Sequence, residues 1–124
     1  MVNTATRPAL VPAAAGTPPG YEQPFWQRAG AVWRQLAGSF SRDGFSFEWH
    51  ELQPPANLNW ANSFHPASVE ICLNLQGSGW VVADGARMDF GPDTAAFFAT
   101  NGGHLQAQRL AGQHHQFLSV EFSL

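Results

Sequence analysis

Turn-forming residues recur at short intervals through the second half of the chain, and their spacing constrains the fold more than any other feature. Asp84-Gly85, Gly91-Pro92-Asp93 and Asn101-Gly102-Gly103 each separate short stretches rich in apolar residues. An Asp-Gly pair in this setting predicts a tight β-hairpin, because glycine adopts the positive φ that the turn requires. The sequence therefore predicts strands from residue 45 onward. The expected strands are 45–52, 58–64, 68–75, 79–83, 87–90, 94–99, 105–110 and 115–123.

Strands at this spacing, with no helices between them, indicate an all-β antiparallel sandwich or barrel of about eight strands. At 124 residues, the chain is long enough for one domain with a single core. Residues 1–23 are rich in Pro, Ala, Gly and Thr and are expected to form a flexible arm, which leaves 24–124 for the barrel domain. Apolar residues from Phe25 to Leu36 recur at spacings of three and four, which predicts an amphipathic helix over about residues 24–37.

Charge and cysteine content exclude several classes of function. The six basic residues are all scattered arginines, and nine acidic residues outnumber them, for a net charge of -3. A nucleic-acid surface needs clustered cations, so we expect no direct nucleic-acid binding. The sequence shows neither a membrane-length apolar run nor a secretion signal, so we expect no membrane association and a cytoplasmic location. Cys72 is the only cysteine and is expected to be a buried, unreactive thiol.

Within the segment 65–77, HPASVEICLNLQG, aliphatic residues alternate with other side chains over 69–75. Glu70, Cys72 and Asn74 share one face of the predicted strand, and four aliphatic residues share the other. Two arrangements remain open. If Glu70 faces the interior, the aliphatic face lies outside the barrel and needs cover from the predicted helix or a second subunit. If the aliphatic residues form the core, Glu70 is a surface carboxylate.

Three segments, SVEICLNLQGSGWVV, DGARMDFGPDTAAFF and GQHHQFLSVEFSL, together resemble the N-terminal sensor domain of AraC-type transcriptional regulators, which is a cupin jelly roll. The resemblance covers a little under half of the chain well. It implies an effector-binding and dimerisation domain, from which the family's DNA-binding helix-turn-helix motifs are absent. The expected partners are a small-molecule effector, such as a sugar or an aromatic compound, and a second copy of the chain. The sequence leaves open an excised domain or a stand-alone relative.

The same resemblance bears on metal binding. Metal-binding cupins carry a His-x-His pair, a glutamate and a glycine in their first motif, and a further histidine in the second. Here His65, Glu70 and Gly77 fit, but Ser63 takes the place of the first histidine and Phe97 that of the last. A transition-metal site normally takes at least about three protein ligands, so we expect no metal, no cofactor and no enzymatic activity. The alternative is a stand-alone metal-dependent cupin enzyme, a dioxygenase or an isomerase.

The aromatic content is high, with five tryptophans and ten phenylalanines against one tyrosine. Most of these rings are expected in the core, but some can line a cavity and stack on a flat ligand. Two other pairs are ambiguous. Glu48 and His50 share a strand face and can pair, although a solvated face explains them equally well, and His114-His115 is expected at a turn edge or the surface. The predicted ligand-binding residues are His65, Glu70, Asn74, Trp49, Trp60, Trp80 and Phe97.

Overall fold

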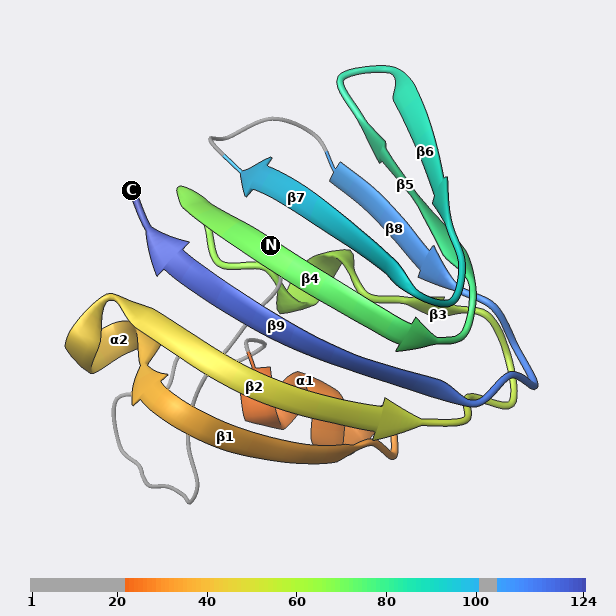
Figure 1. Cartoon of the computed structure of the whole chain (residues 1–124), viewed down its shortest axis with the longest axis horizontal. Coiled ribbons are helices and arrows are strands. Elements are labelled where there is room, and N and C mark those ends of the chain that lie inside the picture. Colours follow the sequence, from red (N-terminus) through yellow and green to blue (C-terminus); the bar gives the residue numbers. More distant parts are fainter. Residues whose placement is uncertain (1–21, 101–104) are drawn as a thin grey trace.

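The computed structural model describes residues 22–100 and 105–124, and in these ranges the chain forms two facing antiparallel sheets (Figure 1). The larger sheet has the strand order β1-β2-β9-β4-β7, and the smaller has the order β3-β8-β5-β6. This confirms the prediction of an all-β antiparallel architecture. Most of the predicted arm, and the turn predicted at 101–103, lie outside the described residues. The elements are α1 (Glu22–Arg28), β1 (Val32–Ser39), α2 (Phe40–Asp43), β2 (Phe45–Leu52), β3 (Leu58–Asn59), a 3₁₀ turn (Ala61–Ser63), β4 (Ser68–Gln76), β5 (Gly79–Ala83), β6 (Ala86–Phe90), β7 (Thr94–Thr100), β8 (Leu105–Arg109) and β9 (His115–Ser123).

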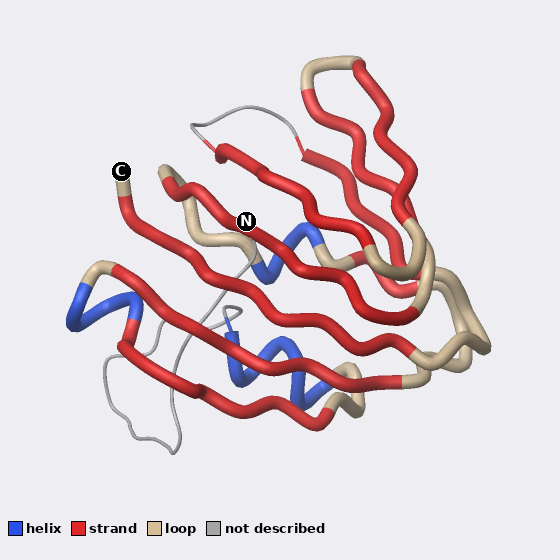
Figure 2. The backbone as a smooth tube through the Cα atoms, viewed as in Figure 1, coloured by secondary structure: helices blue, strands red, loops and turns tan. Residues whose placement is uncertain are grey.

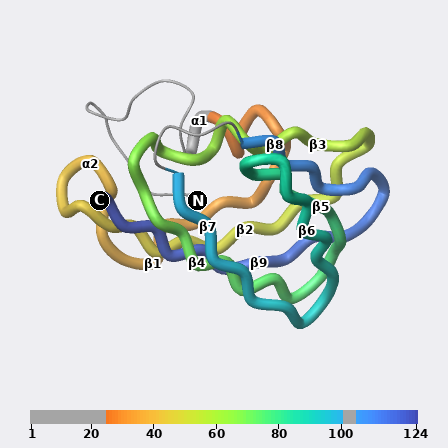
Figure 3. The backbone as a smooth tube through the Cα atoms, turned by 90° about the horizontal axis from the view of Figure 1, so that it is seen from above, coloured from red at the N-terminus to blue at the C-terminus, as the bar shows by residue number. Residues whose placement is uncertain are grey.

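The two sheets enclose an interior that is layered in the view from above, with β1, β2, β9 and β4 on one side and β3 and β8 on the other (Figure 3). The strands of the larger sheet run side by side across the whole molecule, whereas the smaller sheet covers only part of that width (Figure 2). Helix α1 lies over the remainder, against β1 and the 3₁₀ turn. The helix therefore completes the layer that the short strands leave incomplete.

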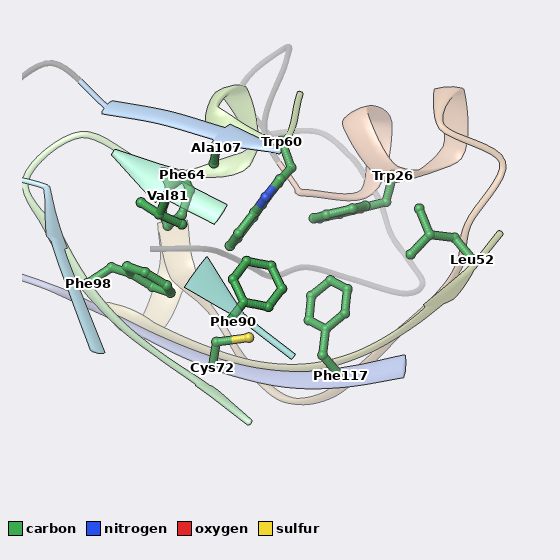
Figure 4. Packing of buried hydrophobic residues seen from close by; sticks show 10 residues of the cluster. All are labelled: Trp26, Leu52, Trp60, Phe64, Cys72, Val81, Phe90, Phe98, Ala107 and Phe117. Carbon is green, nitrogen blue, oxygen red and sulfur yellow. The ribbon is translucent and has the colours of Figure 1, made fainter. Parts of the chain in front are cut away.

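A core of aromatic rings fills the space between the sheets (Figure 4). Trp60 is fully buried, and its ring lies within 6.4 Å of the ring centroids of Phe64, Phe90, Phe98 and Phe117. Large rings at such distances contribute packing and apolar burial in a domain too small for a deep aliphatic core. The buried apolar residues are Trp26, Leu52, Trp60, Phe64, Cys72, Val81, Phe90, Phe98, Ala107 and Phe117.

Strand β4 follows the first of the two arrangements left open by its sequence. Glu70, Cys72 and Asn74 are buried and face the interior. The aliphatic side chains alternate with them on the outer face, where Ile71 and Leu73 are 38% and 41% exposed. Cys72 is buried, as predicted.

The Asp84-Gly85 hairpin is confirmed. Asp84 has a φ of 51° and Gly85 a φ of 78°, the pair of positive values that a type I′ turn requires. The turn pairs Ala83 with Ala86 and sets the β5–β6 register. The Gly91-Pro92-Asp93 turn has a different role, because it carries the chain from β6 in the smaller sheet to β7 in the larger one.

The helix predicted over residues 24–37 is wrong for most of its length. Helix α1 ends at Arg28, and β1 occupies residues 32–39. Gly30 stops the helix: its φ is 74°, its N–H donates to the Gln27 carbonyl, and the next N–H, from Ala31, reaches back to Trp26. This hydrogen-bond pattern is a Schellman C-cap. The apolar spacing over 32–36 misled the prediction because pairing with β2 outweighs a local helical preference.

The strand predicted over 58–64 is also shorter than expected. Only Leu58–Asn59 pairs with β8, and the chain then turns through the 3₁₀ segment. The Asn59 side chain accepts a hydrogen bond from the Ala61 N–H, a local interaction that competes with strand pairing. Among the described residues, no helix has both the length and the apolar character needed to cross a membrane.

Gly79 and Gly91 offer a matched test of this packing. A Cβ on Gly79 would lie 2.1 Å from the Gln108 carbonyl oxygen and 2.7 Å from the Phe90 ring, whereas one on Gly91 meets nothing within 4 Å. We expect Gly79→Ala to lower the free energy of unfolding by about 2 kcal/mol, because backbone and core must both move. Gly91→Ala is expected to change it by less than about 0.5 kcal/mol. Chemical denaturation measures both, and equal effects would contradict the close approach of β5 to β8.

Candidate functional site

The inner face of the larger sheet is polar. Residues on β2, β9 and β4 meet in rows across the sheet: Ser46, Glu121 and Glu70 form one row, and Glu48, Ser119 and Cys72 form the next. A third row holds His50, Phe117 and Asn74. All of these side chains are buried. The interior therefore contains carboxylates at one end of the strands and amide and imidazole groups toward the other.

Glu121 is held by donors from the segment that precedes β4. One carboxylate oxygen accepts from the His65 backbone N–H at 3.0 Å and from the Ser68 hydroxyl at 2.6 Å. The other lies 2.8 Å from His65 Nδ1, which donates to it. The His65 ring stacks on Phe40 with a centroid distance of 3.8 Å. These contacts fix His65 against Glu121 and account for the burial of both groups.

Glu48 has a second set of donors. The Trp33 indole N–H donates to Oε1 at 2.9 Å, and the Ser46 hydroxyl donates to Oε2. His50 Nε2 lies 3.2 Å from Oε1 and 3.1 Å from the Ser119 hydroxyl. Burial, with a further contribution from the charge of Arg109, keeps the pKa of His50 well below its usual value, so the imidazole is neutral at neutral pH. Glu48 and His50 therefore form a buried pair and do not lie on a solvated face.

Glu70 lies on β4, opposite Glu121 in the β4–β9 register. Burial raises the pKa of its carboxyl well above the usual value, and the neighbouring Glu121 and Glu48 charges raise it further. The raised pKa favours the neutral acid over the carboxylate. This is the state in which a carboxyl can donate as well as accept a hydrogen bond.

Arg109, at the end of β8, is the polar centre of the opposite side of the interior. It is fully buried, and its guanidinium carbon lies 3.6 Å from the centroid of the Phe117 ring and 4.8 Å from that of Trp60. Nη1 donates to Asn74 Oδ1 at 2.9 Å and lies 3.4 Å from His115 Nδ1. Burial is the main reason that the pKa of Arg109 falls to about 10, which still leaves the group charged at neutral pH.

The structure divides the seven predicted site residues into two sets. His65, Glu70, Asn74 and Trp60 are buried in the interior. The other three lie on outer faces. Trp49 lies beneath the Arg34 guanidinium at 5.9 Å, Trp80 beneath that of Arg87 at 4.8 Å, and Phe97 is 66% exposed.

Phe97 lies outside because the interior position of β7 is one residue further along the chain. Its neighbour Phe98 faces the core, so the side chain at the interior position is Phe98. Strand parity also separates the two adjacent histidines. His114 pairs with Glu51 at the surface at 2.9 Å, whereas His115 is buried. The expected turn-edge or surface placement therefore holds for His114 only.

Arg109, Glu121 and His115 are interior residues that were not predicted. Their signal was available in the alternation of the last two strands. Ala107 shares a face with Arg109, and Phe117 shares one with His115 and Glu121. A polar residue in register with buried apolar neighbours is the pattern that marks it as inward-facing.

The residues of the expected metal motif do not fit a metal. His65 Nδ1 is occupied by Glu121, the Ser63 hydroxyl donates to the Trp60 carbonyl at 2.8 Å, and the interior position of the second motif is Phe98. Within the described residues, no three His, Cys, Asp or Glu side chains are placed to hold a metal ion.

The fold is shared with solved structures of cupins. No protein-family model matches the sequence, and no curated protein is similar enough to match it. The cupin domain of an XRE-family transcriptional regulator from Enterobacter cloacae aligns with a TM-score of 0.56 and 20% identity, over 76% of this chain and 97% of that one. The chain has the cupin barrel fold.

Two structures with enzyme names have TM-scores at the same level. A protein of Ralstonia eutropha JMP134 with the provisional name mannose-6-phosphate isomerase has a TM-score of 0.56 and 16% identity, over 76% of this chain and 85% of that one. A predicted oxalate decarboxylase of Thermotoga maritima has a TM-score of 0.55 and 16% identity, over 76% and 81%. Likeness at this level concerns the fold, which carries many functions.

Glu70 gives the site a specific pH dependence. Its pKa is raised in the folded state, so the stability it contributes is fully present below pH 4.5, the ordinary pKa of a glutamate side chain, and is lost as the pH rises from there through the raised pKa. Glu70→Gln keeps the shape of the neutral acid and cannot ionise. We expect this variant to unfold at a higher temperature than the wild type at pH 8, and the difference in melting temperature to shrink as the pH approaches 4.5.

The matched control is Asp89→Asn, which alters an exposed carboxylate that is paired with Arg87 at 2.9 Å. Its effect on melting temperature is expected to be small at both ends of the pH range. Thermal unfolding followed by circular dichroism measures both variants. A Glu70→Gln protein less stable than the wild type at pH 8 would show that the ionised carboxylate is favoured in the fold.

Proposed function

We propose that this chain is the small-molecule-binding and dimerisation domain of an AraC-type transcriptional regulator, and that it is not an enzyme. The observation that supports this proposal is the polarity of the sheet formed by β2, β9 and β4. Its inner face carries carboxylates, imidazoles and an amide, and its outer face is mainly apolar, with Glu51 and Gln116 paired at one end. A sheet that served only to pack a core would have the opposite pattern.

The inner face supplies the groups that a small polar ligand needs. Asn74 and Arg109 present hydrogen-bonding groups between aromatic rings, and this is the composition of small-molecule sites, which are largely apolar with a few fixed polar groups. The effector is proposed to bind between the sheets on this side. An effector that binds one conformation more tightly than another shifts their populations, which is how a sensor domain acts on an attached DNA-binding unit.

DNA binding itself is assigned to the helix-turn-helix motifs of the proposed family. Within the described residues, α1 has 7 residues and α2 has 4, both shorter than a recognition helix that fills the major groove. In this proposal the described domain contributes sensing and assembly only.

The outer face supports a second copy as the partner. The outward positions of β4, β7 and β9 carry no charged side chain, and Phe97 and Phe122 on them are 66% and 43% exposed. Large exposed apolar faces mark interaction sites, and a face without charges has nothing to pair with a charged partner. The same surface on a second copy is complementary to it across a two-fold axis.

A ligand screen tests the sensing role. Sugars and aromatic acids are added to the protein, and a compound that binds only the folded state raises its melting temperature, by about 2.7 kcal/mol of stability at 100 times its Kd. Ligand-induced quenching of tryptophan fluorescence is expected to survive Trp49→Phe and to fall in Trp60→Phe, because Trp60 lies in the interior and Trp49 on an outer face. Co-purification of about one equivalent of Fe, Mn, Zn or Ni would instead favour the alternative, a metal-dependent cupin enzyme.

Oligomeric state tests the assembly role. We expect the wild type to be a dimer by light scattering and Phe97→Glu to be a monomer of unchanged circular dichroism, because the substitution places a charge in an apolar contact. Met88→Glu is the control, since Met88 is 39% exposed but lies on β6 of the other sheet. A monomeric wild type, or dimers in all three proteins, would contradict the outer face as the interface.

A further inference from the structure

The edge strands of the two described sheets differ in how they are protected from pairing with another chain. β1 carries a bulge between Gln35 and Ala37, and its Arg34 is exposed. β3 has only 2 residues, and β6 presents the exposed charges of Arg87 and Asp89. Bulges, charges and short length are features by which edge strands avoid association with other chains. These three edges are therefore protected.

The remaining edge strand, β7, has none of these features. Its 7 residues, TAAFFAT, include no charged residue, no proline and no glycine, and their register with β4 is unbroken. Among the described strands, only β4 pairs with β7, and Figure 1 shows β7 at the border of the larger sheet. A short segment of high β-propensity, without charge or proline, is the kind that pairs with a further strand. The free edge of β7 is therefore suited to strand addition.

The sequence of β7 reads almost the same in both directions, and this favours a second copy of the chain as the added strand. Antiparallel pairing centred on Phe97 places the Phe97 side chains of the two copies opposite each other. The flanking pairs are alanine with phenylalanine at 96 and 98, alanine with alanine at 95 and 99, and threonine with threonine at 94 and 100. Aromatic pairs and Thr–Thr pairs across strands are favourable, and no like charges meet. The edge is thus complementary to itself.

Strand alternation and strand length select this register over its neighbours. Ala95, Phe97 and Ala99 are exposed on the outer face, whereas Phe98 is buried in the core. A slide by one residue would place the outward side chains of one copy opposite the inward side chains of the other, because side chains alternate along a strand. A slide by two residues keeps the faces but leaves the last two strand residues without a partner in the opposite strand. Pairing centred on Phe97 satisfies both conditions.

We propose that the free edge of β7 pairs antiparallel with the same edge of a second copy, in the register centred on Phe97. The two larger sheets then form one continuous sheet, with both apolar outer faces on the same side. This contact goes beyond the proposed function and does not depend on it. The two-fold axis of the edge contact is perpendicular to the sheet, whereas that of stacked outer faces is parallel to it, so a chain that uses both can form a closed tetramer. Because one pair of strands covers little surface, the edge contact is expected at higher protein concentration than the outer-face dimer.

The test places cysteines at two positions that this register brings together. Ala95→Cys and Ala99→Cys are made separately, one of them with a tag that changes its mass, and are mixed at high concentration with a mild oxidant. Residues opposite each other across a strand pair have Cβ atoms about 4.5–5.5 Å apart, within reach of a disulfide. In either variant alone, the two cysteines are about 13 Å apart along the strands, which a disulfide does not span. We expect the mixture to yield at least about 10-fold more cross-linked dimer than either variant alone.

Leu73→Cys is the matched control. Leu73 is 41% exposed on the same outer face and is the β4 partner of Ala95, so it lies one strand further from the edge. Mixed with Ala99→Cys, it is expected to give no more cross-linked dimer than the wild type, whose Cys72 is buried. All three variants replace exposed side chains, and circular dichroism checks that each keeps the wild-type fold.

Three results would overturn the inference. Cross-linking of either β7 variant alone, at the level of the mixture, would show a different register. Equal cross-linking of Leu73→Cys with Ala99→Cys would show that the copies meet through their outer faces and not through the edge. A mixture of Ala95→Cys and Ala99→Cys that forms no cross-link would show that the β7 edges do not pair. In that last case, a wild type that sediments as a dimer at every concentration leaves the outer-face dimer of the proposed function standing.

Discussion

Alternation along the strands of the larger sheet is the constraint on which the rest of this structure depends. Because successive side chains point to opposite faces, the inward positions of β2, β4 and β9 bring carboxylates, imidazoles and an amide into one interior. Each of these groups needs donors or acceptors once water is excluded. The hydrogen bonds of Glu121 therefore determine where the segment before β4 lies, and those of Glu48 tie β1 to β2 through Trp33. Satisfaction of polar groups, as well as apolar packing, shapes this small barrel.

The interior has a direction. Along β4 the inward side chains change from a carboxyl at Glu70, through the thiol of Cys72, to the amide of Asn74. The carboxyl end is closed by protein donors, whereas the amide end meets the cation of Arg109. Aromatic rings, Phe117 and Trp60 among them, lie over the guanidinium and separate it from solvent. The two ends of the interior thus differ in charge and in how many of their polar atoms have hydrogen-bond partners in the protein.

Much of the fold was predictable because turn chemistry is local. The positive φ values at Asp84-Gly85 follow from the residue types alone. Residues 32–39 were not predictable as a strand, since their spacing of apolar residues suits a helix and only pairing with β2 decides the outcome. Whether Glu70 faces the interior was undecided for a related reason. Strand alternation puts Glu70 and the aliphatic residues on opposite faces of β4, but which face is inside depends on the second sheet. Arg109 could be placed in the interior only from its strand: Ala107, on the same face of β8, is buried, and so the charged side chain at 109 is buried too.

Helix α1 shows how a short element depends on one side chain. A helix of 7 residues has no independent stability in water, so its place is held by Trp26, which is fully buried beside His50 and Phe117. We expect the backbone amides of this helix to be protected from hydrogen exchange only while the Trp26 indole stays buried. We expect its opening free energy to lie below that of the central strands, so that each opening would expose His50, which lies against the Trp26 ring. The covering helix is therefore the point at which the interior is most readily hydrated.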